Sequence, residues 1–225
     1  MVELWAVLPY CEAMCAHYTG FSDEDIDLLV AQLMGEEPQS QETQSQSNQD
    51  RKRIDVYPQQ VAPVIVPTFD TSVGVPQFAQ GTLERADLEW GYSSQWNPRP
   101  IFNTRIESAD KPIWRSSMEH GRCVIACRSF YESSGTETRI SERTGRPIKQ
   151  QYIFTIPNMP VIFIGGIRRD DEYSMVTTRA NALMEPVHAR MPLILHPTEL
   201  TTWLGPDYMR LADRSQVPLA LHKAD

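Results

Sequence analysis

Four short strings in the chain combine residue types that can carry nucleophilic chemistry. They are M-C-A-H-Y at 14–18, N-T-R-I-E at 103–107, S-F-Y-E at 129–132 and H-A-R-M-P at 188–192. The cysteine, histidine and asparagine among them, Cys15, His188 and Asn103, superficially match the grouping of a thiol peptidase. Glu132 adds a carboxylate that could move protons in general acid–base catalysis.

Each of these residues, taken alone, also has a purely structural explanation. A carboxylate such as Glu132 at a strand end is most often solvated, and Asn103 is typical of a turn. His188 alone is more typical of a satisfied histidine, and Trp90 and Trp96 of core packing. The chain contains no G-x-S-x-G elbow, P-loop, G-x-G-x-x-G or H-E-x-x-H motif, so the common hydrolase, nucleotide-binding and metalloprotease interpretations lack support.

The four cysteines form two C-x3-C pairs, Cys11 with Cys15 and Cys123 with Cys127, which suggest zinc at first sight. The second pair falls in an expected strand, where residues four apart lie about 13 Å from each other. One tetrahedral zinc ion, with bonds of about 2.3 Å, cannot hold both thiolates. We therefore expect buried structural thiols at Cys123 and Cys127, and no metal or other cofactor.

The charge distribution permits a local nucleic-acid site despite a net charge of −8 over 225 residues. Residues 1–53 hold 3 basic and 10 acidic side chains, net −7, whereas residues 99–149 hold 10 basic and 6 acidic ones, net +4. Arginine outnumbers lysine 17 to 4, and guanidinium binds phosphate in bidentate fashion. The longest apolar runs fall far short of the ~20 residues that a membrane helix needs. With no secretory signal visible, we expect a cytoplasmic protein with reduced thiols.

The secondary structure that the sequence predicts around these residues consists mostly of strands. A first helix is predicted from the cap Ser22 to the stop Gly35, and shorter helices at 112–120, 181–185 and 198–204. β-Branched and aromatic runs predict strands at 61–66, 122–127, 129–132, 151–156, 161–165 and 173–178. The pair Gly165-Gly166 predicts a turn or bulge. Without a βαβ rhythm, this order predicts an α+β domain built on a mainly antiparallel sheet or open β-barrel with short flanking helices.

The stretch 39–50 has no apolar side chain and consists of Gln, Ser, Glu, Thr, Asn and Asp. Such a segment cannot bury surface, so it predicts a polar disordered insertion at about 36–53. One helix before it is too little for a separate domain. We interpret residues 15–225 as a single domain that contains this insertion, and residues 1–14 as an N-terminal extension.

Together and in this order, the four strings resemble the SRAP family (SOS response-associated peptidase domain), whose members crosslink to abasic sites in single-stranded DNA. The resemblance spans roughly residues 14–205. It includes Trp90-Gly91 with Trp96, the string T-T-R-A-N at 177–181, and D-V-Y-P-Q-Q at 55–60, which is similar to the family's N-x-x-P-T-Q segment. The resemblance also implies a monomer.

The resemblance implies a catalytic role for four residues. Cys15 would be the nucleophile, and Asn103 would orient its amine. Glu132 would transfer protons, and a raised pKa from partial burial would suit that role. His188 would assist opening of the abasic sugar ring.

The implied DNA contacts are four further side chains. Arg105 and Arg190 would bind phosphates that flank the lesion, and Trp90 would wedge or stack against the DNA. The family's Gly-Arg after the cysteine is Ala16-His17 here, so His17 takes the place of one phosphate-binding arginine. A further departure is Ser133, where the family usually has a tryptophan.

The family's chemistry requires a free α-amino group on the cysteine. Its pKa is about 8, against about 10.4 for lysine, so a useful fraction is neutral at pH 7. The amine condenses with the aldehyde of the ring-opened sugar, and the thiol of the same residue then closes a thiazolidine ring. Thirteen residues precede Met14, so this chemistry requires either that Met14 is the true start or that the bond to Cys15 is cleaved.

Our leading hypothesis is therefore a protein that shields abasic single-stranded DNA through a covalent crosslink during the DNA damage response. One alternative is a thiol-dependent peptidase that removes its own leader before Cys15. The other is a non-catalytic DNA-binding module in which Cys15 is inert within the chain. No membrane partner is expected.

Overall fold

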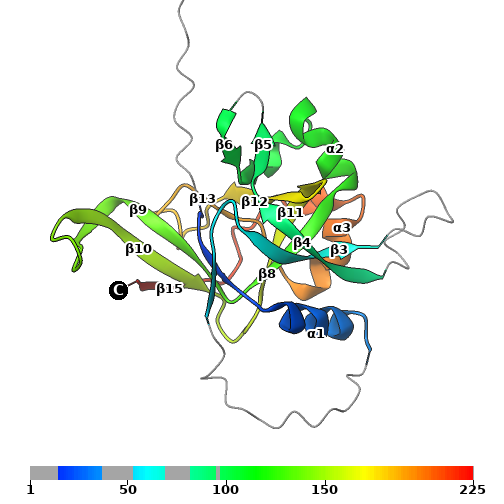
Figure 1. Cartoon of the computed structure of the whole chain (residues 1–225), viewed down its shortest axis with the longest axis horizontal. Helices are drawn as coiled ribbons and strands as arrows, with labels where there is room; N and C mark the ends of the chain where they lie inside the picture. Colours follow the sequence, from blue (N-terminus) through cyan, green and yellow to red (C-terminus); the bar gives the residue numbers. More distant parts are fainter. Residues whose placement is uncertain (1–14, 37–52, 69–81, 95–96, 225) are drawn as a thin grey trace, which may run out of the picture.

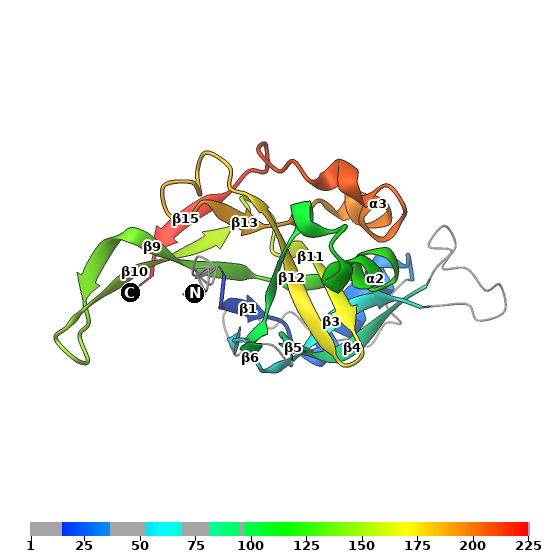
Figure 2. The same cartoon turned by 90° about the horizontal axis from the view of Figure 1, so that it is seen from above.

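The computed structural model describes residues 15–36, 53–68, 82–94 and 97–224. These residues form two sheets with short helices packed around one of them (Figures 1 and 2). The described residues do not include the expected extension at 1–14, with Cys11 and Met14, or almost all of the expected insertion at 36–53. They also do not include Trp96.

The smaller sheet is antiparallel and carries the segment that follows Cys15. Its strand order is β15-β10-β9-β1-β2. The strands are β1 (Tyr18–Gly20), β2 (Ile54–Val56), β9 (Ser129–Ile140), β10 (Pro147–Thr155) and β15 (Ala220–Lys223). Because β1 pairs with β9 in the register Tyr18 to Phe130, the chain just before β1 lies beside the residues that follow Phe130.

The larger sheet has the order β13-β12-β4-β3-β8-β11-β14, with β7 attached to β12. Its strands are β3 (Val61–Pro67), β4 (Leu83–Trp90), β7 (Asn103–Arg105), β8 (Arg122–Cys127), β11 (Ile162–Arg169), β12 (Glu172–Arg179), β13 (Arg190–Pro192) and β14 (Ile194–Leu195). β12 pairs in parallel with β4 and β7, and the other pairings of this sheet are antiparallel. Because β11 also pairs with β12, the sheet curls back on itself. A separate hairpin joins β5 (Tyr92–Ser94) to β6 (Asn97–Ile101). The prediction of a mainly antiparallel α+β fold is confirmed.

Both faces of the larger sheet are covered, which explains why β8 is apolar from Cys123 to Cys127. Cys123, Ile125 and Cys127 point into the core between the two sheets. Val124 and Ala126 point the other way, into a second core that the helices cover. Strands buried on both faces need continuous apolar runs. Cys123 and Cys127 are free buried thiols, as expected.

Three helices cover that second core. α1 (Asp23–Leu33) begins where Ser22 accepts the N–H of Asp25 at 3.2 Å, as its capping sequence predicts. α2 (Pro112–His120) has the predicted bounds, and the predicted third helix is η3 (Pro197–Glu199) running into α3 (Leu200–Leu204). Two further short 3₁₀ turns are η2 (Ile106–Ser108) and η4 (Tyr208–Leu211).

The helix predicted at 181–185 is wrong, because this segment is a loop of turns. The side-chain oxygen of Asn181 accepts the N–H groups of Leu183 and Met184, at 3.2 and 3.0 Å. Asparagine competes with helix formation in this way by offering the backbone a local partner. The loop leads to His188 and β13.

The turn or bulge predicted at Gly165-Gly166 is also wrong, since both residues lie within β11, opposite Val124 and Cys123. A Cβ on Gly166 would lie 2.9 Å from the Cys123 Sγ, and one on Gly165 would lie 3.0 Å from Trp203. These glycines therefore permit close packing on the two faces of the sheet.

β9 and β10 extend well past the strand ends that the sequence predicts. Beyond a bulge, where Ser133 pairs with Gln151 and Thr138 pairs with Lys149, the two strands continue as a hairpin that projects from the body (Figures 1 and 2). We call residues 138–149 the arm. β15 pairs with β10 only from Tyr152 to Thr155, so it supports the base of this hairpin and not the arm.

Candidate functional site

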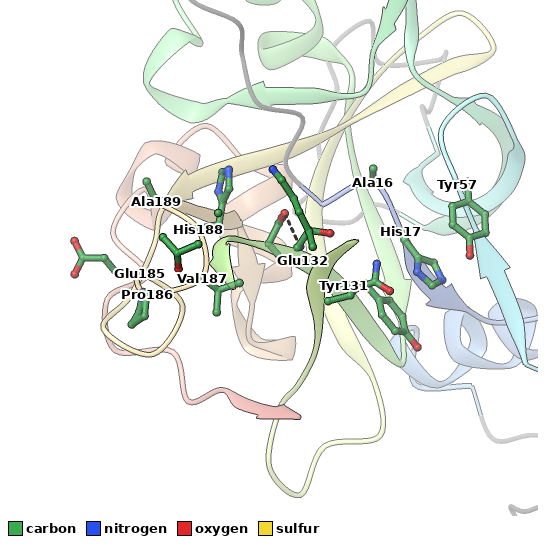
Figure 3. A pocket seen from close by; sticks show the side chains of 15 residues that line it. Ala16, His17, Tyr57, Tyr131, Glu132, Glu185, Pro186, Val187, His188 and Ala189 are labelled. Carbon is green, nitrogen blue, oxygen red and sulfur yellow. Dashed lines mark hydrogen bonds between the residues drawn. The ribbon is translucent and has the colours of Figure 1, made fainter. Parts of the chain in front are cut away.

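An open pocket of about 560 Å³ lies where the start of β1, the loop before β13 and the base of the hairpin meet. Its lining includes His17, Tyr57, Glu132, Lys149 and His188. In Figure 3, Glu132 lies between His188 on one side and His17 with Tyr57 on the other. The sequence strings that contain Cys15, Glu132 and His188 therefore converge on one pocket.

Cys15 and Glu132 are joined directly. The N–H of Tyr131 donates to the carbonyl of His17 at 2.9 Å, which continues the β1–β9 pairing toward Cys15. The backbone N–H of Cys15 donates to Oε2 of Glu132 at 2.6 Å, and Oε1 of Glu132 accepts the N–H of Ser133 at 3.0 Å. Glu132 is only 5% exposed. Its carboxylate is thus aimed at the nitrogen that would become an α-amine if the chain began at Cys15.

The Cys15 thiol is enclosed by protein. The residue is fully buried, and its Sγ donates to the carbonyl of His17 at 3.9 Å. Burial raises the pKa of the Cys15 thiol well above its ordinary value, and the nearby charge of Glu132 raises it further. Cys15 also has a φ of +41°, in the left-handed region that non-glycine residues seldom adopt outside strained functional positions.

His188 reaches the same pocket from the loop between β12 and β13. Its Nδ1 accepts the backbone N–H of Arg190 at 3.1 Å, which fixes the orientation of the ring. A neutral imidazole that accepts at Nδ1 carries its proton at Nε2. In that tautomer Nε2 carries the N–H; in the other one, Nδ1 would donate to the Arg190 carbonyl, which lies 3.3 Å away.

His17 is held among aromatic rings rather than extended toward solvent. Its ring stacks between Tyr57 and Tyr131, with centroid distances of 4.4 and 3.8 Å, and its Nε2 lies 2.8 Å from Oδ1 of Asp55. Burial lowers the pKa of His17, although Asp55 opposes the effect. Sequence reasoning missed the other three members of this cluster. These residues belong to the strings D-V-Y-P-Q-Q and S-F-Y-E, which bring Tyr57 and Tyr131 to the pocket wall and place Asp55 behind His17.

Asn103 and the two candidate phosphate-binding arginines gather around β12. Met175 and Thr177 of β12 are in register with Asn103 and Arg105 of β7. On the other side of β12, the Arg190 Nη2 donates to the carbonyl of Thr177 and to Oε2 of Glu107, both at 2.8 Å. Asn103 is half-buried and does not line the pocket described above. Its role in orienting the Cys15 amine stays a prediction, as do the DNA contacts of both arginines.

Trp90 does not offer a stacking surface, which corrects the expectation that it stacks on DNA. The residue is fully buried at the end of β4, and its indole N–H donates to the carbonyl of Phe102 at 2.9 Å. Its ring packs against Tyr18, Tyr173 and Phe102. An enclosed ring has no face on which a base could stack, so Trp90 serves the core.

We predict that Trp90→Ala lowers the free energy of unfolding by about 3–5 kcal/mol, because it leaves a large cavity and an unsatisfied Phe102 carbonyl. Urea denaturation followed by circular dichroism measures the effect. Trp90→Phe, which keeps most of the packing, should lower the free energy of unfolding by less than Trp90→Ala does. A Trp90→Ala protein as stable as the unchanged one would contradict this assignment.

Within the described ranges, no group of three or more His, Cys, Asp or Glu side chains could hold a metal ion. None of the helices in these ranges is long and apolar enough to cross a membrane.

Comparison with known sequences matches residues 14–223 to the family model described as SOS response associated peptidase (SRAP). The chain is 28% identical over 127 residues to the abasic site processing protein YoqW of Bacillus subtilis, an alignment that covers 53% of this chain and 56% of that protein. It is also 28% identical over 129 residues to the abasic site processing protein YedK of Escherichia coli, covering 51% and 52% of the two chains. The chain thus spans about half the length of the curated relatives it matches.

Two solved structures share the fold over almost the whole chain. One, of a protein from Bordetella bronchiseptica, superposes with a TM-score of 0.63 at 17% identity and covers 94% of this chain and 100% of its own. The other, from Bacteroides thetaiotaomicron, has a TM-score of 0.62 at 19% identity and covers 94% and 92%. The family match over residues 14–223, with the same architecture in these structures, leads to one conclusion: the chain belongs to the SRAP family.

Proposed function

We propose that this protein acts at abasic sites in single-stranded DNA and forms a covalent thiazolidine crosslink through Cys15, once residues 1–14 have been removed. Two matched relatives are named abasic site processing proteins. The crosslink would shield the lesion during the DNA damage response. We further propose that the protein works as a cytoplasmic monomer.

The observation that carries this proposal is the 2.6 Å hydrogen bond from the Cys15 nitrogen to Glu132. A buried carboxylate beside an α-amine can take up a proton as the amine attacks a carbonyl, and can return it when water leaves. The amide nitrogen occupies the place where that amine would lie. His188 lines the same pocket, where its Nε2–H could donate to the sugar oxygen that is released on ring opening.

The proposed reaction needs no further reagent. The amine of Cys15 attacks the C1 aldehyde of the open sugar, and loss of one water gives an imine. The thiol then adds across the C=N bond: sulfur bonds to carbon, and the thiol proton ends on nitrogen. Both nucleophiles belong to one residue, so the second step is intramolecular and is favoured by proximity.

Removal of the leader is the part of the peptidase hypothesis that the site favours. Hydrolysis of the Met14–Cys15 bond would release an amine beside Glu132 and relieve the left-handed φ of Cys15. A general peptidase is less well supported, because the Nδ1 of His188 is engaged by the Arg190 backbone and the Cys15 thiol is enclosed and protonated.

The test is to express the whole chain, measure its intact mass and N-terminal residue, and incubate it with abasic single-stranded DNA before a denaturing gel. We expect the purified protein to begin at Cys15 and to give a slowly migrating adduct, and an undamaged strand to give none. A chain that begins at Cys15 but gives no adduct would contradict the proposal and favour the non-catalytic module. Adduct formation by a chain with an intact Met14–Cys15 bond would contradict the role of the amine.

A further inference from the structure

The arm, residues 138–149, is a basic projection on an acidic protein. It carries Arg139, Arg143, Arg146 and Lys149 against the single carboxylate Glu142, so four positive charges less one give a net charge of +3, whereas the whole chain has −8. Arg143, Arg146 and Lys149 are exposed. In the part of the chain that the structure describes, no ion pair joins these three side chains to a carboxylate.

Three cations outside the arm are each paired with a carboxylate. Arg85 contacts Asp87 at 2.5 Å, Arg214 contacts Glu199 at 2.7 Å, and Lys223, at the base of the hairpin, contacts Glu137 at 2.9 Å. The contact to Glu137 lies just outside the arm and neutralises that carboxylate, so it does not offset the charge of the arm. The arm therefore keeps its positive charge for a partner.

The arm begins at the pocket. Lys149 and Gln151 of β10 both line the pocket that contains Glu132. Arg146 lies three residues before Lys149, just outside β10 and toward the tip of the hairpin. The tip is closed by the Gly145 N–H donating to the Ser141 carbonyl at 2.7 Å, which places Arg143 within a defined turn. The cations are thus distributed from the pocket, at Lys149, to the tip of a hairpin that projects from the body (Figures 1 and 2).

We propose that the arm binds the sugar–phosphate backbone of the DNA strand whose lesion lies in the pocket, a few nucleotides away from that lesion. This inference rests on the proposed function, since it needs a nucleic acid in the pocket. Arginines on a two-stranded ribbon can contact phosphates without reading bases, so the arm adds affinity and not sequence preference. The exposed Ile140 and Ile148 offer apolar contact to sugars between the cations.

A charge-matched pair of double variants tests the arm. Arg143→Gln/Arg146→Gln removes two charges from the arm, and Lys111→Gln/Arg115→Gln removes two exposed charges at the start of α2, which lies away from the arm (Figure 1). Each protein is titrated with an undamaged fluorescent strand of about 20 nucleotides, and with one of about 5 nucleotides that can fill only the pocket region. The measurement is repeated over a range of salt concentrations.

We expect the arm variant to bind the long strand about tenfold more weakly at low salt, with a slope of log K against log salt smaller by about 1.4, since each phosphate contact contributes about 0.7. The control variant should match the unchanged protein, and the short strand should bind all three proteins equally. Equal losses in both variants, equal losses on both strands, or no loss in the arm variant would overturn the inference.

Failure of the arm and failure of the proposed function give different results. Undamaged strands report binding alone, and the abasic-strand gel reports the covalent step. If the unchanged protein crosslinks abasic DNA while the arm variant binds the long strand normally, only the arm inference falls. If the arm variant weakens binding but no protein crosslinks, the arm inference stands and the covalent function falls. If no strand binds at all, both are overturned.

Discussion

A chain that begins at position 15 and carries Cys15→Ala is expected to lose all adduct that is stable on a denaturing gel. This variant keeps the α-amine that Glu132 would hold, so it can still form an imine with the abasic aldehyde. It has no thiol with which to close the ring, so the imine hydrolyses back. Treatment with borohydride during the incubation should trap that imine and restore a slowly migrating band.

The matched control is Cys127→Ala, which removes a fully buried thiol from the same core and should leave the adduct yield unchanged. A stable adduct from Cys15→Ala without borohydride would mean that another nucleophile reacts. Loss of adduct from both variants would point to damaged packing, which urea denaturation of the two proteins would detect.

The second large effect is expected for Glu132→Gln, which should slow crosslink formation by about 100-fold at neutral pH. Glutamine is nearly isosteric, and its one carbonyl oxygen can still accept the N–H of Cys15, although its NH2 group cannot accept the N–H of Ser133. Urea denaturation therefore checks that the variant keeps its fold. Glutamine cannot take up the proton that the attacking amine must lose. The measurement is the rate of adduct formation under single-turnover conditions, read from gel time courses.

Glu185→Gln provides the comparison, because Glu185 is an exposed carboxylate that lines the same pocket. Its neutralisation changes the local charge equally but removes no contact to Cys15, so the rate should not change. Equal slowing of the two variants would mean that the pocket's overall charge matters and not the proton transfer. An unchanged rate in Glu132→Gln would remove Glu132 from the mechanism.

The sequence could predict those parts of the fold whose pattern is local. Ser22 marks the start of α1, and the apolar run from Cys123 to Cys127 predicts strand β8 with its buried thiols. The sequence did not predict β4, because its residues, L-E-R-A-D-L-E-W, include charged side chains on an exposed face. The arm was not predicted for the same reason. Its two strands have few apolar side chains, and they are stabilised mainly by pairing with each other.

At the site, the residue types could be predicted but not their distances. The strings with Cys15 and Glu132 carry the resemblance, yet only the β1–β9 register brings them within one hydrogen bond. For Trp90, the sequence resemblance led to a wrong role, because a tryptophan in a matching string does not reveal whether its ring faces solvent or core. Burial depends on strands from distant parts of the chain, and no single string encodes it.

The enclosure of the Cys15 thiol also bears on its resistance to oxidation. Peroxides and disulfides react with the thiolate, and the reaction is fastest for exposed cysteines of low pKa. A fully buried thiol whose pKa is raised by burial stays protonated at neutral pH. Cys15, as the proposed nucleophile, is therefore expected to react with such oxidants more slowly than an exposed thiol would.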